Sequence, residues 1–173
     1  TGLSAWNLAM GSQELYDWLD AEPQLFHPGD LDYIHSVERI SKLSNVISIN
    51  GGVQLDLMGQ ENAESTGTRQ LSGVGGQMDF LEGAYRSKGG KGFICINSSR
   101  VTKNGERKSN ILATIPGGST ISAPRTMIQY VATEYGIASL SGKTLRERAE
   151  AMASIAHPDF REELMKYAQE NFK

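Results

Sequence analysis

The sequence Gly73-Val74-Gly75-Gly76-Gln77-Met78-Asp79-Phe80 lies in a glycine-rich stretch, directly before an apolar run and between two predicted strands. Its two adjacent glycines let the main chain approach a ligand closely and present bare N–H groups to it. Such donors suit an oxygen that becomes negative during acyl transfer. Taken alone, a glycine loop is most often only a turn, so other residues have to decide between the two interpretations.

Two nucleotide-binding motifs do not fit this stretch. A dinucleotide fingerprint that begins Gly73-x-Gly75 needs a third glycine at position 78, where the chain has Met78. A P-loop is also excluded, because no Gly-Lys-Ser/Thr follows at the required spacing.

The composition is that of an ordinary globular domain. With 173 residues, the chain is long enough for one domain with a substantial core. The net charge of -3 gives no reason to expect binding to nucleic acid or to an acidic membrane surface. No segment approaches the ~20 apolar residues that cross a bilayer, and no signal peptide is visible at the N-terminus. We therefore expect a cytoplasmic protein.

Cysteine and histidine usage indicates no metal centre. The single cysteine, Cys95, lies in the apolar run 93–96, which predicts a thiol buried in a strand. The absence of cysteine pairing agrees with a reducing compartment. No two histidines have metal-binding spacing. A serine hydrolase is not indicated either, because there is no Gly-x-Ser-x-Gly elbow.

Hydrophobic periodicity predicts an α/β fold, with helices near both ends of the chain and strands between them. The helices are expected at 12–20, 36–43, 78–87, from the capping-box pair Thr144 and Glu147 onward, and from Pro158 onward. The strands are expected at 46–49, 53–57, 93–97, 111–115 and 128–133, with turns at 58–61 and 103–106 and a loop at 26–33. This order indicates a single domain, residues 1–173, with helices layered on a mixed β-sheet.

Four further polar residues are candidates for a site. Lys88 and Lys91 flank a Gly-Gly turn and could hold a phosphate, although a solvated turn is the simpler interpretation. Glu134 follows a predicted strand and precedes a glycine turn, which suits either an active-site carboxylate or a turn cap or ion pair. His35 lies where a loop meets a helix, a position more typical of packing than of catalysis.

Several segments together resemble one family, and the resemblance extends over nearly the whole chain. They are Ile47-Ser48-Ile49-Asn50, Val53-x-Leu55-Asp56-Leu57-x-Gly59-Gln60, Glu64-Ser65-x-Gly67, Ser72 to Phe80, Ser87-Lys88-Gly89-Gly90-Lys91, Thr133-Glu134-Tyr135-Gly136, Gly142-Lys143-x-Leu145-Arg146-Glu147-Arg148-Ala149 and Ile155-Ala156-His157-Pro158-Asp159-Phe160-Arg161. Their order and spacing resemble the C-terminal domain of the acetyl-CoA hydrolase/transferase family, which includes 4-hydroxybutyrate and butyryl-CoA:acetate CoA-transferases.

The resemblance implies a two-domain enzyme with ping-pong chemistry. In that family a glutamate attacks an acyl-CoA thioester, and the CoA is then carried as a glutamyl-CoA thioester to an incoming carboxylate. The resemblance maps the oxyanion-binding glycine loop to Gly75, Gly76 and Gln77. Gly73 and Gln77 are candidates for binding the substrate or CoA, together with Lys88 and Lys91. It also maps an active-site carboxylate to Glu134.

Two departures from the family pattern matter. The family's nucleophilic glutamate lies in a motif upstream of all the matched segments, and neither Glu14 nor Glu22 has its surroundings. The family's N-terminal CoA-binding half is absent as well. At position 35 the chain has His35, where members commonly carry an active-site asparagine.

From these features we expect the C-terminal part of a CoA-transferase that moves CoA between a short-chain acyl-CoA and a carboxylate such as acetate, and that is inactive without the rest of the enzyme. CoA is expected as a co-substrate, with no permanently bound cofactor. The expected partners are the N-terminal domain of the same enzyme and a second copy in a homodimer. An acyl-CoA hydrolase and a free-standing, non-catalytic binding domain are the alternatives.

Overall fold

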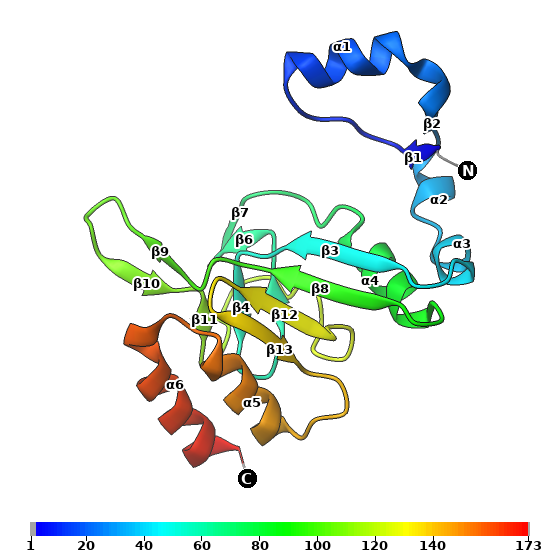
Figure 1. Cartoon of the computed structure of the whole chain (residues 1–173). Coiled ribbons are helices and arrows are strands. Elements are labelled where there is room, and N and C mark those ends of the chain that lie inside the picture. The colour runs from blue at the N-terminus through cyan, green and yellow to red at the C-terminus, as the bar shows by residue number, and fades with distance from the viewer. Residues whose placement is uncertain (1–2, 173) are drawn as a thin grey trace.

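The centre of the protein is a four-stranded sheet in the computed structural model, which describes residues 3–172 (Figure 1). Its strand order is β13-β12-β8-β3. Three strands run parallel, and the fourth, β13, pairs antiparallel with β12 at one edge. The bounds are β3 Ile47–Gly51, β8 Lys91–Cys95, β12 Tyr130–Thr133 and β13 Gly136–Ser139. The predicted mixed sheet is therefore confirmed.

Helices cover one face of this sheet. Helix α4 (Gln77–Arg86) packs on β3 and β8, and α3 (Val37–Lys42) packs on α4, where Ile40 occupies the space that a side chain at Gly83 would need. Helix α5 (Leu145–Ser154) packs on β13, and α6 (Pro158–Asn171) packs on α5. The capping box predicted at the start of α5 is present.

The other face of the sheet carries apolar side chains that the described residues leave uncovered. Ile49 is 68% exposed and Ile137 is 63% exposed, and Ile47 lies on the same face. Phe93 and Tyr130 are register partners there and stack with ring centroids 4.9 Å apart. Parallel strands that are apolar on both faces are normally covered on both faces. This surface, named here the uncovered sheet face, is available to another structural unit.

A second, smaller sheet packs beside the first. Its strand order is β11-β4-β5, from Ile111–Leu112, Gln54–Asp56 and Glu61–Asn62. Buried Arg148 of α5 anchors the surrounding loops by donating hydrogen bonds to the backbone carbonyls of Met58, Leu140 and Arg125, each at 2.8 Å. Two hairpins complete this region, β6–β7 (Ser65–Thr66 with Arg69–Gln70) and β9–β10 (Ser99–Val101 with Arg107–Ser109).

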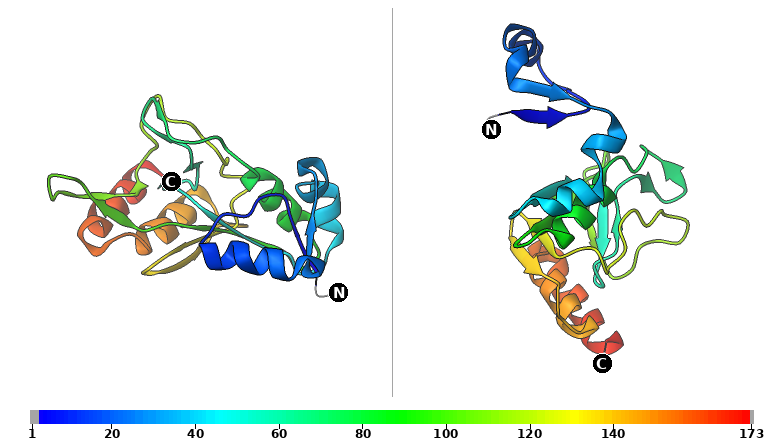
Figure 2. Two further views of the ribbon diagram at one scale, coloured as in Figure 1. Left: turned by 90° about the horizontal axis from the view of Figure 1, so that it is seen from above. Right: turned by 90° about the vertical axis from the view of Figure 1, so that its right-hand side faces the viewer.

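The N-terminal elements stand apart from the sheet, as the two further views show (Figure 2). These elements, named here the N-terminal arm, are β1 Ser4–Trp6, α1 Gln13–Ala21, the 3-10 turn Pro23–Leu25, β2 Phe26–Pro28 and α2 Leu31–Ile34. Helix α1 begins at its Ser12 cap but buries none of its residues; Trp18 contacts Phe26 across the arm, with ring centroids 4.8 Å apart. No helix within residues 3–172 is long and apolar enough to cross a membrane.

Three local expectations were wrong. The predicted loop at 26–33 contains strand β2 and the start of helix α2. The strand predicted at 53–57 is shorter, since β4 spans only Gln54–Asp56, and its polar residues Gln54 and Asp56 are buried because β4 is the middle strand of the smaller sheet. Glu61 was placed in a turn, yet it begins strand β5 and is fully buried.

Candidate functional site

One edge of the main sheet gathers most of the candidate residues. The carboxyl ends of the parallel strands β3, β8 and β12 meet at this edge, which brings Gly52, Cys95 and Glu134 to the same side. Helix α4 ends at Arg86, just before β8 begins at the opposite edge, so its N-terminus with Gly76 points toward the carboxyl edge. In open α/β sheets this edge is where ligands bind.

The glycine loop presents backbone N–H groups at the start of α4. Gly75 has φ +61°, a left-handed conformation that side chains disfavour, and Gly76 is the N-cap residue of the helix. Within residues 3–172 no protein group accepts a hydrogen bond from either N–H. Free N–H groups at the positive end of a ten-residue helix attract an anionic oxygen.

His35 lies directly against this loop. A Cβ atom added at Gly76 would lie 2.1 Å from the imidazole Cε1 of His35, so only glycine fits at that position. The Nδ1 atom of His35 is 3.4 Å from an Asp79 carboxylate oxygen, and the ring packs edge-on to Phe80 with centroids 5.0 Å apart. The structure therefore brings together the histidine and the glycine pair that the sequence singled out.

Glu134 lies just beyond the end of β12 and is held by Ser98. The backbone N–H of Ser98 donates to Oε2 of Glu134 at 2.9 Å, and the Ser98 hydroxyl donates to Oε1 at 2.6 Å. Partial burial acts to raise the pKa of Glu134, but these hydrogen bonds outweigh it and hold the pKa below its ordinary value. Glu134 is thus an exposed, ionised carboxylate with a fixed orientation.

A cavity of about 430 Å³ opens beside Glu134. Its other lining residues are Gly52, Cys95, Ile96, Asn97, Ala132 and Thr133. Cys95 corrects a prediction, since the thiol is exposed rather than buried. The alternation of the strand turns Ile94 into the core and Cys95 onto the uncovered sheet face.

The sequence did not reveal the role of Glu61. Its side chain is fully buried, and its Oε2 accepts a hydrogen bond from the side-chain amide of Gln77, the first residue of α4. Burial raises the pKa of Glu61 to about 8, although the hydrogen bond from Gln77 acts to lower it. No local pattern could have identified this residue, because its burial depends on the distant Gln77 and Gly52.

Lys88 and Lys91 lie away from this group. Lys88 lies in the turn between α4 and β8, and Lys91 is the first residue of β8, so both are at the amino edge of the sheet; the backbone carbonyl of Lys88 accepts a hydrogen bond from the backbone N–H of Asn45 at 2.9 Å. The length of strand β8 therefore separates them from Cys95 and the carboxyl edge. A role for these lysines in phosphate binding remains a prediction.

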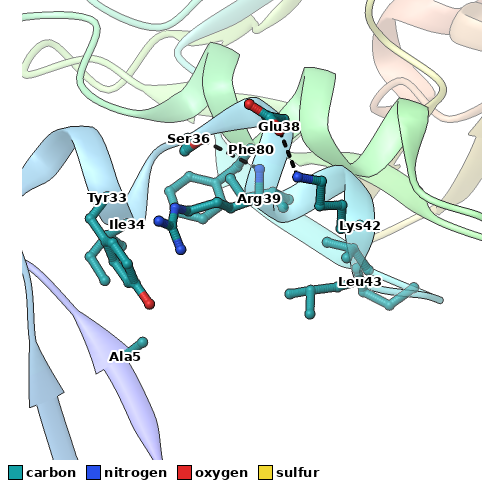
Figure 3. A pocket seen from close by; sticks show the side chains of 12 residues that line it. Ala5, Tyr33, Ile34, Ser36, Glu38, Arg39, Lys42, Leu43 and Phe80 are labelled. Atoms are coloured by element: carbon teal, nitrogen blue, oxygen red, sulfur yellow. Dashed lines mark hydrogen bonds and ion pairs between the residues drawn. The ribbon is translucent and has the colours of Figure 1, made fainter.

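A larger cavity, of about 710 Å³, does not coincide with this edge (Figure 3). It is an open groove between Ala5 of the N-terminal arm, helix α3 and Phe80. Of its charged residues, Glu38 and Lys42 pair with each other, and the guanidinium of Arg39 lies over the Tyr33 ring, 4.0 Å from its centroid. No group of metal-binding side chains occurs among residues 3–172. The carboxyl edge is therefore the better candidate site, because it combines N–H groups that have no acceptor within residues 3–172 with the carboxylate of Glu134.

Comparisons with known proteins all point to one family. Residues 11–168 match the family described as the acetyl-CoA hydrolase/transferase C-terminal domain. The chain is 45% identical over 161 residues to a butyryl-CoA:acetate CoA-transferase of Anaerostipes caccae, covering 93% of this chain and 36% of that protein. It is 46% identical over 164 residues to a probable butyrate:acetyl-CoA coenzyme A-transferase of Syntrophomonas wolfei, covering 95% of this chain and 36% of that protein.

Solved structures give the same result. RipA from Yersinia pestis superposes with a TM-score of 0.85 at 38% identity, covering 98% of this chain and 37% of that one. The chain thus spans little more than a third of the length of the relatives it matches. With nearly all of its residues matched, the chain belongs to the family of acetyl-CoA hydrolase/transferase C-terminal domains.

Proposed function

We propose that this chain is the C-terminal part of a CoA-transferase that exchanges CoA between a short-chain acyl-CoA and a carboxylate such as acetate. The observation that carries this proposal is the pair of free N–H groups at Gly75 and Gly76, on the same sheet edge as Glu134. The similarity to CoA-transferases over nearly the whole chain supports it. The nucleophilic glutamate and much of the CoA site belong to the part of the enzyme outside these residues.

The proposed chemistry places negative charge on a carbonyl oxygen twice. The nucleophilic carboxylate adds to the thioester carbonyl. The C–S bond then breaks, so that CoA leaves as a thiolate and an acyl-glutamyl anhydride is formed. The thiolate then adds to the glutamyl carbonyl, and the acyl group leaves as a free carboxylate. The N–H groups of Gly75 and Gly76 stabilise the oxyanion of each addition. The incoming carboxylate takes the CoA by the reverse sequence.

The neighbouring side chains orient the reactants in this proposal. Glu134 is fixed by Ser98 and stays ionised, so it directs polar groups in the cavity rather than delivering a proton. His35 presents an imidazole beside Gly76 and supplies a hydrogen-bond donor at the place where relatives commonly carry asparagine. Gly73 and the main chain of Gln77 extend the substrate-binding loop.

The uncovered sheet face supports a contact with the rest of the enzyme. Ile47, Ile49 and Ile137 are all more than half exposed, and a contiguous apolar patch of this kind marks an interface. We infer that the N-terminal domain of the enzyme covers this face. Cys95 is on this face and also lines the cavity beside Glu134, so the same contact would close the site. Homodimer formation and a cytoplasmic location remain predictions.

The test is acetate-dependent CoA transfer from butyryl-CoA by the complete reading frame that contains this chain. Butyrate and acetyl-CoA should form together, and omitting acetate should abolish turnover. Release of free CoA without acetate would instead indicate a hydrolase. CoA binding without turnover, across acyl groups of different length, would indicate a non-catalytic binding domain. The 173-residue chain alone should be inactive.

A further inference from the structure

Glu61 is the most unusual polar residue outside the proposed reaction. Its side chain has no solvent exposure, and its Oε1 atom has no hydrogen-bond partner within residues 3–172. A buried carboxyl group without a cation beside it is costly in its charged form. Strand β5 nevertheless fixes it there, through a backbone bond from its N–H to the carbonyl of Ala123 at 3.0 Å.

The two carboxyl oxygens face two different parts of the candidate site. Oε2 accepts the hydrogen bond from the side chain of Gln77, which directly follows the glycine pair. Oε1 lies under Gly52, where an added Cβ atom would come within 2.7 Å of it. Gly52 lines the cavity beside Glu134. Glu61 therefore connects the start of α4 with the floor of that cavity.

Among residues 3–172, no cation lies beside Glu61 to compensate a charge on its carboxyl group. The nearby cations have other partners: Arg148 donates to the backbone carbonyls of Met58, Leu140 and Arg125, and Arg125 contacts Met58. The nearby carboxylates are also engaged elsewhere, since Asp56 accepts from Gln60, Glu64 accepts from Gln70 and Ser122, and Asp79 lies near His35. Within the same described residues, the neutral amide of Gln77 is the one side-chain donor to the Glu61 carboxyl group. The protonated form is therefore the one that this environment accommodates.

We propose that protonated Glu61 is a positioning residue that holds Gln77, and through it the glycine loop, in place, and that loss of its proton releases this arrangement. An ionised Glu61 would draw water or a cation into the space between Gly52 and Gln77. The N-terminus of α4 would then move, and Gly75 and Gly76 would lose their common orientation. Burial raises the pKa of Glu61 to about 8, so the change falls in the mildly alkaline range.

The functional part of this inference rests on the proposed CoA transfer, but its structural part can be tested without turnover. In this chain labelled with ¹³C and ¹⁵N, NMR should show the Glu61 carboxyl titrating near pH 8 and the side-chain amide of Gln77 shifting with the same midpoint. Glu61→Gln should abolish the shift at Gln77. A Glu61 carboxyl that titrates near the ordinary value of 4.5 would overturn the inference, whether or not the enzyme transfers CoA.

In the complete enzyme, the variants should separate positioning from simple loss of structure. Glu61→Gln keeps an acceptor for Gln77, so the kcat of this variant should be near the wild-type value at neutral pH. In the wild-type enzyme kcat should decline about tenfold per pH unit above the midpoint, and this decline should be absent from Glu61→Gln. Glu61→Leu removes the acceptor and should lower kcat at every pH. Glu64→Gln is the matched control and should keep the wild-type profile. An alkaline decline that persists unchanged in Glu61→Gln would refute the proposed role, even if CoA transfer is confirmed.

Discussion

Replacing Glu61 by glutamine should change how the stability of this domain depends on pH. In the folded protein, burial raises the pKa of Glu61 from 4.5 to about 8. Between these values the unfolded chain has released the proton while the folded protein retains it, so stability falls as pH rises. The contribution of Glu61 to the free energy of unfolding is fully present below pH 4.5, and it is lost as the pH rises through the pKa of the folded state.

The magnitude follows from this linkage. Each pH unit within that range lowers the free energy of unfolding by about 1.4 kcal/mol, and the whole range amounts to about 5 kcal/mol. At neutral pH the loss is already about 3 kcal/mol by the same relation. Glutamine cannot ionise, so this slope is absent in Glu61→Gln. Its new amide group facing Gly52 costs about 1–3 kcal/mol, but that cost does not depend on pH.

The assay is urea unfolding followed by circular dichroism, at several pH values from about 5 to about 8, with linear extrapolation to water. The difference in unfolding free energy between Glu61→Gln and wild type should grow by about 1.4 kcal/mol per pH unit. Glu64→Gln, the same chemical change three residues along the chain, should leave the wild-type slope intact. Parallel curves for wild type and Glu61→Gln would refute the reasoning, because they would mean that Glu61 is already ionised in the folded protein.

Four further predictions concern the site and its supports. Gly76→Val should lower kcat of the complete enzyme by about 10²-fold or more, because its side chain would displace His35 and the N–H donors; steady-state kinetics measure this, and unchanged kcat would contradict it. Ser98→Ala removes the hydrogen bond from the Ser98 hydroxyl to Glu134, which helps to orient this carboxylate. The pKa of Glu134 should therefore rise, and the acid limb of the kcat/KM profile should move to higher pH. Arg148→Met leaves the buried carbonyl of Leu140 and the partly buried carbonyls of Met58 and Arg125 without these donors, and should lower the unfolding free energy by about 3 kcal/mol in urea titrations; a loss below about 1 kcal/mol would show that these bonds matter little. Ile49→Lys should reduce self-association of the isolated chain in analytical ultracentrifugation, but should lower the stability of the complete enzyme, in which the N-terminal domain is inferred to cover this residue. No effect on either property would argue against an interface at the uncovered sheet face.

Features encoded in short segments were predictable from the sequence. The helix caps at Ser12, Thr144 and His157 are local side-chain-to-backbone hydrogen bonds, and α5 begins at its predicted capping box. The glycine pair also has a local signature, since its backbone conformation depends on residues that lack a side chain. His35 could be placed at the same site only through the family resemblance, because its contact with Gly76 joins positions far apart in the chain.

What the sequence did not reveal depends on contacts between distant segments. Cys95 looked buried because it lies in the apolar run 93–96, yet the part of the chain that the structure describes covers only one face of the sheet. Glu61 looked like a turn residue because it ends the segment Met58-Gly59-Gln60-Glu61. Its burial becomes visible only when Gln77 and Gly52 close around it. Lys88 and Lys91 were candidates because they flank a Gly-Gly turn of their own, but α4 separates that turn from the glycine loop and carries it to the opposite edge of the sheet.

The central claim is that Gly75 and Gly76 stabilise the oxyanion in a CoA-transferase whose nucleophile is supplied from outside this chain. Its most direct test measures acetate-dependent CoA transfer from butyryl-CoA by three proteins: the complete reading frame, its Gly76→Val variant, and the 173-residue chain alone. We predict turnover by the complete enzyme, loss of most of that turnover in the Gly76→Val variant, and none in the isolated chain. Full activity of the Gly76→Val variant, or turnover by the isolated chain, would contradict the claim.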